Sequence, residues 1–254
     1  GKAWDRNRRP DCGPNVAAAA VSPNRKSIMS RRQTKKSEPA RSGAIAPDAR
    51  RHRLADWTGG VPVFMPQGYE AGYDYPLLVW LSDPLGPPVD LGRCMARVSL
   101  RNFVAVAAVG GATAVWQAVD RVTDRLSIHP RRIWLVGRDA AGTEAFRIAC
   151  RHPESFAGVV SLGGAFPLDE SLFARIDAVR RLPMLYCCTA ADASGATGGT
   201  DRMLRLFHAA GATLAMRIYP RRRDLGAVAL ADVNRWLMDE TCGSAATART
   251  AVAG

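Results

Sequence analysis

Residues 132–167 read RIWLVGRDAAGTEAFRIACRHPESFAGVVSLGGAFP, and this stretch decides the fold. An apolar run ends at Gly137, a turn of small residues follows, and apolar residues then recur at helical spacing from Ala145 to Ala149. A second apolar run follows at Gly158–Leu162. A strand, a tight turn, a helix and another strand in this order predict two parallel strands joined by a crossover helix.

The same alternation extends along most of the chain. Continuous apolar runs, typical of strands covered on both faces, occur at 61–65, 76–82, 103–109, 184–189 and 214–219. Apolar residues at helical spacing lie between them, at 114–126, 203–207 and 228–237. The sequence therefore predicts an α/β protein with a mostly parallel central sheet and helices on both faces.

The stretch 132–167 closely resembles the nucleophile-elbow region of the α/β-hydrolase superfamily, nearest to its small carboxylesterase/phospholipase and feruloyl-esterase-like branch. Downstream, LPMLYCCTAAD (182–192) resembles the strand that carries the family's catalytic acid. LFHAAGATLAMRIYP (206–220) resembles the helix and strand before the family's catalytic histidine. The resemblance covers about residues 60–240 and implies the α/β-hydrolase fold, a three-layer sandwich.

The catalytic positions depart from the family's pattern. The family's elbow reads Gly-x-Ser-x-Gly, with the serine on a strained turn. Here Asp139 stands at the serine position and Ala141 at the second glycine. Asp224 stands where the family's histidine follows Tyr-Pro, and Asp192 matches the acid. The resemblance thus implies triad-equivalent positions Asp139, Asp192 and Asp224, with no intact triad.

The surroundings of the elbow depart from the pattern as well. The oxyanion-equivalent positions are Ser82, Asp83 and Ala140, and Pro84 has no N–H to donate there. Three carboxylates brought close together would raise the pKa of at least one of them. Four arginines are candidates for anion binding, and we expect ion pairs between arginines and carboxylates to fill the former cleft: Arg138, Arg221, Arg222 and Arg223.

These departures predict a non-catalytic binding or regulatory protein, a pseudoenzyme, for an unknown small-molecule ligand or protein partner. A serine hydrolase mechanism needs a hydroxyl, a base near neutrality and a carboxylate that orients the base. An active, atypical ester or acyl hydrolase stays open as an alternative, with Asp139 as nucleophile or with a displaced base such as His129 or His208. Enzymatic activity is therefore undecided by the sequence.

The charge of the chain is concentrated in its N-terminal part. Residues 1–53 carry 14 Lys/Arg against 4 Asp/Glu, whereas residues 54–254 carry 21 against 19. We predict a basic disordered arm at 1–53, a hydrolase-like domain at 54–240 and a flexible tail at 241–254. The arm suits weak, salt-dependent contact with nucleic acid or an anionic surface, or else it is a solvated tail with no specific role.

Other features exclude several classes of site. The six cysteines form no CxxC pair and have no histidine at metal-ligand spacing, so we predict no metal site and no cofactor. No run approaches the ~18 apolar residues of a membrane-spanning helix. The apolar stretch Ala17–Val21 is shorter than a signal-peptide core of about 7–15 residues, which predicts a cytoplasmic protein with reduced thiols.

Overall fold

The computed structural model describes residues 54–56, 61–168, 170, 172, 174–194 and 199–252, with side chains from residue 61 to residue 242. The predicted basic arm, 1–53, lies outside the described residues.

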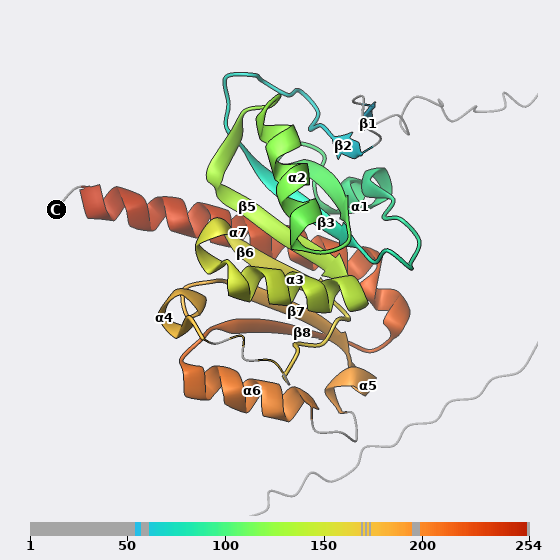
Figure 1. The fold of residues 1–254 in the computed structure, drawn as a ribbon, viewed down its shortest axis with the longest axis vertical. Coiled ribbons are helices and arrows are strands. Elements are labelled where there is room, and N and C mark those ends of the chain that lie inside the picture. Colours follow the sequence, from blue (N-terminus) through green and yellow to red (C-terminus); the bar gives the residue numbers. More distant parts are fainter. Residues whose placement is uncertain are drawn as a thin grey trace, which may run out of the picture. The chain divides into compact units, whose positions relative to one another are not determined.

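Within the described residues, a sheet of eight strands forms the middle layer (Figure 1), in the order β1-β2-β4-β3-β5-β6-β7-β8. From β4 to β8 in this order, every strand is parallel to its neighbour. Strand β2 is antiparallel to both of its neighbours, β4 and β1. The strands are β1 (Leu54–Asp56), β2 (Pro62–Phe64), β3 (Tyr75–Ser82), β4 (Val104–Val109), β5 (Ile128–Arg138), β6 (Gly158–Leu162), β7 (Met184–Thr189) and β8 (Leu214–Tyr219). The prediction of a mostly parallel sheet is confirmed.

Helices cover the sheet on both faces (Figure 1). They are α1 (Leu91–Val98), α2 (Ala112–Thr123), α3 (Ala140–Arg151), α4 (Ile176–Val179), α5 (Ala190–Ala193), α6 (Gly199–Ala210) and α7 (Ala227–Val252), with 3-10 turns η2 (Pro153–Ser155) and η3 (Arg222–Leu225). Residues of α2, α3 and α6 share one apolar core with Val79 and Leu81 of β3. Residues of α1 and α7 share the other core with Leu78 and Trp80. The alternation along β3 therefore separates two cores, which is the predicted three-layer sandwich.

The short elements β1, α4 and α5 are absent from the sequence prediction, and two longer helices differ from it as well. Helix α1 was not predicted, although its buried Leu91, Met95 and Val98 follow helical spacing and Asp90 caps its first turn by accepting from the N–H of Arg93. The helix has only eight residues, too few for its periodicity to stand out. Helix α7 continues to Val252, through residues predicted as a flexible tail, in a segment rich in alanine, the best helix former.

Candidate functional site

The candidate site lies where β5 turns into α3. Asp139 is the one non-glycine residue with a positive φ among the described residues, at φ 52° and ψ −124°. Such a conformation costs about 1–3 kcal/mol and persists where the surrounding structure enforces it. Here the N–H of Asp139 donates to the carbonyl of Leu162 at 2.9 Å, and its own carbonyl accepts from Gly142 N at 2.9 Å. The strained elbow is therefore built although an aspartate occupies it.

Close backbone packing holds the elbow in place. A Cβ on Gly137 would lie 2.2 Å from the carbonyl oxygen of Ala141. A Cβ on Gly164, in the loop after β6, would lie 2.0 Å from the carbonyl oxygen of Asp139. Ala141, which stands at the family's second glycine position, fits with its side chain buried. Glycine at 137 and 164 lets the turn approach the neighbouring backbone, so the geometry needs these two residues.

The carboxylate of Asp139 forms an ion pair with an arginine that lies 83 residues later in the sequence. Arg222 Nη2, in η3 after β8, donates to Asp139 Oδ1 at 2.6 Å. The side chains are 46% exposed for Asp139 and 69% for Arg222. An ion pair this exposed contributes about 0–1 kcal/mol to stability. The pair matters for the site because it places a guanidinium against the carboxylate at the strained turn.

Asp192 lies in α5, directly after β7, and its side chain caps the first turn of that helix. Its Oδ2 accepts from the N–H of Thr189 at 3.0 Å and from Thr189 Oγ1 at 2.7 Å, and its N–H donates to Thr189 Oγ1 at 3.2 Å. The hydrogen bond from the Thr189 hydroxyl, then the one from the Thr189 N–H, lowers the pKa of Asp192, and the charge of Arg222 lowers it further. The rise in pKa expected from crowded carboxylates is thus not found at Asp192.

Asp224 pairs with its neighbour Arg221. Its Oδ2 lies 3.8 Å from Arg221 Nε, and its N–H donates to the carbonyl of Arg221 at 2.9 Å within the η3 turn. Among the hydrogen bonds and ion pairs of the described residues, none joins Asp224 to Asp139. The structure therefore brings Arg222 against the elbow, whereas the interactions of Asp224 are made with Arg221 inside the η3 turn.

The other predicted arginines brace the same turn. Arg138 Nη2 donates to the carbonyl of Leu225 at 3.2 Å, which ties the end of β5 to η3. The carbonyl of Arg223, which is exposed, accepts from Gly226 N at 3.1 Å. Arg221 and Arg222 form arginine–carboxylate pairs with Asp224 and Asp139, while a cavity lined by Asp139 stays open, so the filling of a former cleft stays a prediction.

The oxyanion-equivalent residues line one cavity together with Asp139. The cavity measures about 350 Å³ and also contacts Pro87, Pro88 and Cys94. Ser82 is buried and its Oγ accepts from Val89 N at 3.2 Å, while Asp83 Oδ1 accepts from Leu85 N at 2.9 Å. Ala140 begins α3. Sequence reasoning missed Cys94, because nothing in its sequence neighbourhood separates it from other half-buried thiols.

The described histidines lie elsewhere. His129 Nδ1 accepts from Arg131 N at 3.2 Å, and His152 caps the end of α3 with its ring edge-on to Trp116. His208 is exposed on α6, and His52 lies outside the described residues. Within the described part of the chain, no histidine hydrogen-bonds to Asp139. No imidazole base therefore stands beside the elbow there.

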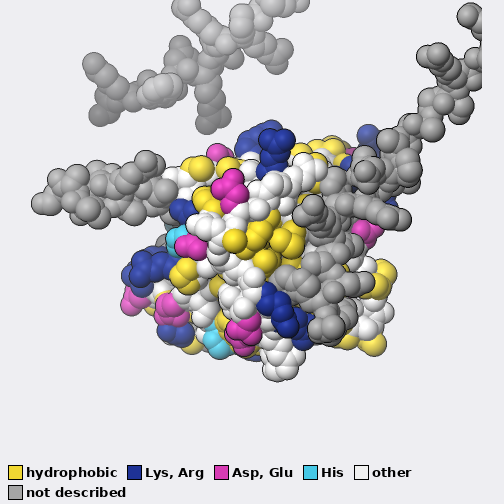
Figure 2. Space-filling model, turned by 90° about the horizontal axis from the view of Figure 1, so that it is seen from above, with side chains coloured by type: hydrophobic (Ala, Val, Ile, Leu, Met, Phe, Trp, Pro, Cys, Tyr) yellow, Lys and Arg dark blue, Asp and Glu magenta, His cyan; other side chains and the backbone are white. Residues whose placement is uncertain are grey.

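The described residues offer neither a metal site nor a membrane-spanning helix. They contain no group of three or more His, Cys, Asp or Glu side chains able to hold a metal ion. None of their helices combines the length and apolarity needed to cross a membrane. Figure 2 shows one face of the molecule, where basic and acidic side chains lie interspersed among hydrophobic ones, as the balanced charge of residues 54–254 predicts.

The chain is similar to known proteins in its structure, whereas its sequence gives no match. No protein-family model matches the sequence, and no curated protein matches it. A thermostable esterase superposes with TM-score 0.56 at 14% identity over 70% of this chain, which spans 58% of that enzyme. A ferulic acid esterase gives 0.54 at 15% identity, over 71% of this chain and 91% of that one.

A substrate-bound, fluorophosphonate-binding serine hydrolase of Staphylococcus aureus gives a TM-score of 0.54 at 10% identity, over 70% of this chain and 91% of that one. Identities this low relate the folds alone. Together with the strand order and the strained turn after β5, they show that the chain has the α/β-hydrolase fold.

Proposed function

We propose that the chain is a non-catalytic binding or regulatory protein that keeps the α/β-hydrolase fold, a pseudoenzyme. The observation that carries the proposal is the ion pair between Asp139, at the nucleophile position, and Arg222. The elbow geometry is retained, whereas the group that it presents is a carboxylate already neutralised by a guanidinium.

The chemistry of these two side chains argues against acyl transfer. A serine hydrolase needs a base that removes the proton of the hydroxyl and returns it to the leaving group. A guanidinium has no acceptor site and stays protonated in proteins, so Arg222 supplies no base. An aspartate nucleophile would form an ester with its substrate, and hydrolysis of that ester would also need a base to activate water.

Binding remains supported by the cavity beside the elbow. Its volume of about 350 Å³ lies within the usual range of ligand pockets. Its walls combine apolar side chains, such as Pro87 and Val89, with polar groups on Ser82 and Asp83. A small molecule held there would lie against Asp139 without a group able to transform it.

Two further proposals concern the cellular compartment of the protein and the binding partners of residues 1–53. Free thiols at Cys94, Cys150, Cys187, Cys188 and Cys242 support a reducing compartment such as the cytoplasm. The excess of ten positive charges in residues 1–53 supports weak contact with nucleic acid or an anionic surface. If the arm makes that contact, deletion of residues 1–53 abolishes retention on an anionic column at low salt.

The test of the main proposal is hydrolysis of short-chain p-nitrophenyl esters by the full chain, by Asp139→Ala and by Asp139→Ser. We expect no turnover above background from any of the three, because the serine variant gains a hydroxyl but no base. Turnover by the unmodified chain that disappears in Asp139→Ala would overturn the proposal in favour of an aspartate nucleophile. Turnover by Asp139→Ser would show that a base is available at the elbow.

A further inference from the structure

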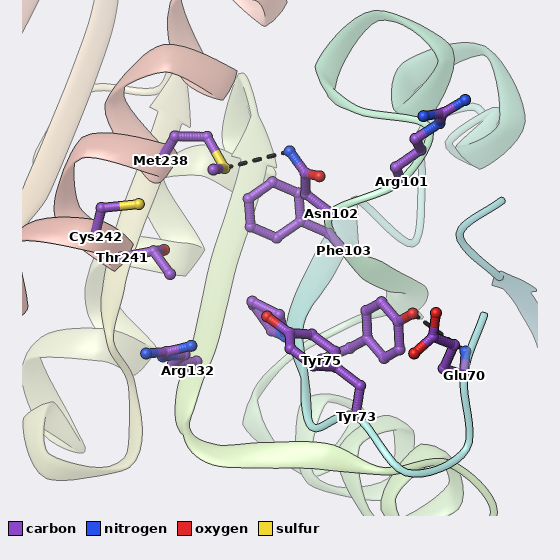
Figure 3. A pocket seen from close by; sticks show the side chains of 11 residues that line it. Glu70, Tyr73, Tyr75, Arg101, Asn102, Phe103, Arg132, Met238, Thr241 and Cys242 are labelled. Atoms are coloured by element: carbon purple, nitrogen blue, oxygen red, sulfur yellow. Dashed lines mark hydrogen bonds between the residues drawn. The ribbon is translucent and has the colours of Figure 1, made fainter. Parts of the chain in front are cut away.

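A second cavity lies at the opposite edge of the sheet from Asp139. It measures about 450 Å³ and is lined by residues near the amino ends of the parallel strands and by α7 (Figure 3). Tyr75 and Arg132 belong to β3 and β5, and Phe103 precedes β4. Met238, Thr241 and Cys242 come from α7. The candidate site at the elbow follows the carboxyl ends of the same strands, so the two cavities are separate.

Aromatic side chains form one wall of this cavity. The rings of Tyr73 and Tyr75 meet edge-on with centroids 4.7 Å apart, and Tyr69 stacks on Tyr75 at 5.1 Å. The Tyr75 hydroxyl accepts from the N–H of Glu70 at 3.2 Å, which fixes that ring. Phe103 is fully buried, whereas Tyr73 is 51% exposed. The wall is therefore held in place by its own contacts, with one ring open to solvent.

The polar groups of the lining lack strong partners. Within the described residues, neither Arg132 nor Arg101 lies within ion-pair distance of a carboxylate. Asn102 Nδ2 donates to the thioether of Met238 at 3.4 Å, a weak acceptor. Thr241 Oγ1 is buried with no hydrogen-bond partner among the described residues. The Thr241 oxygen has less than 1 Å² of accessible surface, so the groups of the lining that are open to a charged occupant are the two guanidiniums.

The two guanidiniums differ in their setting. Arg132 is half-buried and lies on the same side of the cavity as Thr241 and Cys242, as Figure 3 shows. Arg101 is exposed and extends away from the other labelled side chains. Glu70 supplies the lining with a carboxylate at the far end, beyond Tyr75. Arg132 is therefore the charge best placed to hold an anionic group inside the cavity.

We propose that this cavity binds a small aromatic carboxylate, with its carboxylate on Arg132 and its ring against the exposed ring of Tyr73. A guanidinium offers two parallel donors that match the two oxygens of a carboxylate. The aromatic wall favours a planar ring through edge-on or offset contacts. This function is independent of the elbow, since none of the lining residues belongs to the elbow's cavity.

Calorimetric titration of the full chain with benzoate, benzyl alcohol and benzylammonium tests the proposal. These probes share the ring and differ in charge. We expect benzoate to bind at least about tenfold more tightly than either of the others, because hydrogen bonds to charged groups are stronger than neutral ones. Equal binding of benzoate and benzyl alcohol, or no binding of benzoate, would overturn the proposal.

Single substitutions test whether benzoate binds at Arg132. Arg132→Gln should weaken benzoate binding about tenfold. Arg131→Gln is the matched control, since Arg131 is the exposed neighbour on β5 and does not line the cavity. Asp139→Ala should leave benzoate binding unchanged, and a loss there would move the site to the elbow. Unchanged binding in Arg132→Gln would refute the assigned contact.

Thiol modification gives a second readout that does not depend on a variant. Cys242 lines the cavity and is exposed, so bound benzoate should slow its alkylation, measured peptide by peptide. Cys94, which lines the elbow's cavity, serves as the internal reference whose rate should stay constant. Equal slowing at both cysteines, or at neither, would contradict binding at this cavity.

Discussion

Arg222 Nη2 lies 2.6 Å from Asp139 Oδ1, although 83 residues separate the two in sequence. The contact joins the η3 turn after β8 to the strained elbow after β5. It also brings the guanidinium within electrostatic range of Asp192, whose pKa it helps to lower after the two hydrogen bonds from Thr189. One arginine therefore pairs with Asp139 and acts on the charge of Asp192, whereas Asp224 pairs with Arg221.

The backbone at Asp139 should favour glycine over alanine. Neither Asp139→Gly nor Asp139→Ala keeps the carboxylate, so the difference between them reports the backbone at φ 52°. We expect the glycine variant to be more stable to urea by about 1 kcal/mol, because glycine adopts positive φ without steric cost. In the exposed middle of α2, Gln117→Gly should instead be less stable than Gln117→Ala by about 1 kcal/mol. The same order at both sites would contradict strain at the elbow.

The close approach at Gly164 predicts a large loss of stability. In Gly164→Ala the new methyl group would meet the carbonyl oxygen of Asp139 at 2.0 Å and the nitrogen of Thr143 at 2.6 Å. Since both contacts are backbone atoms, we expect destabilisation of about 3 kcal/mol in chemical denaturation. Gly72→Ala, where a Cβ meets nothing within 4 Å, is the control and should change stability by less than about 0.5 kcal/mol. Similar losses in both variants would argue against the packing at Gly164.

The capping role of Asp192 predicts a pH-dependent contribution to stability. The hydrogen bonds from Thr189 lower the pKa of Asp192 in the folded state. The stabilisation is therefore complete above the unfolded pKa of about 3.9 and is lost as the pH falls through the lower folded value. At pH 7 we expect Asp192→Ala to cost about 1 kcal/mol.

Urea titrations of Asp192→Ala at several pH values check this prediction. The stability gap between the variant and the parent should narrow as the pH falls below about 4. Asp177→Ala is the control, since the Asp177 side chain is 85% exposed and makes one ion pair at 3.7 Å. A gap at Asp192 that widens on acidification would contradict the assigned direction of the pKa shift.

The cysteines should react in an order set by burial. Burial raises the pKa of the Cys150 thiol to about 12, and it raises that of Cys187 to about 12 as well. Since the thiolate is the reactive form, iodoacetamide at pH 8 should modify exposed Cys242 first and leave Cys150 and Cys187 unmodified in the folded protein. In guanidinium chloride all three should react at similar rates. Rapid alkylation of Cys150 in the folded state would show that the core around α3 opens.

The fold was predictable because its signals are local. Apolar runs identified β3, β4, β6 and β7, whose residues are almost all buried because both faces of these strands are covered. The edge strand β8 was identified as well, although Arg217 and Ile218 in it are exposed. The capping box of Thr189 and Asp192 is also local, at a spacing of three residues, and a closer reading of TAAD would have predicted it. Helix α1 was missed because eight residues contain too few turns for a periodic pattern.

The sequence alone determined the layered α/β architecture and the position of the tight turn at Asp139 between a strand and a helix. These properties follow from residue types and short spacings. Only the tertiary structure decided that Arg222 pairs with Asp139, and that Arg132 and Thr241 line one cavity. Those contacts join residues far apart in the chain, and their geometry depends on how the turns after β8 and the helix α7 pack against the sheet.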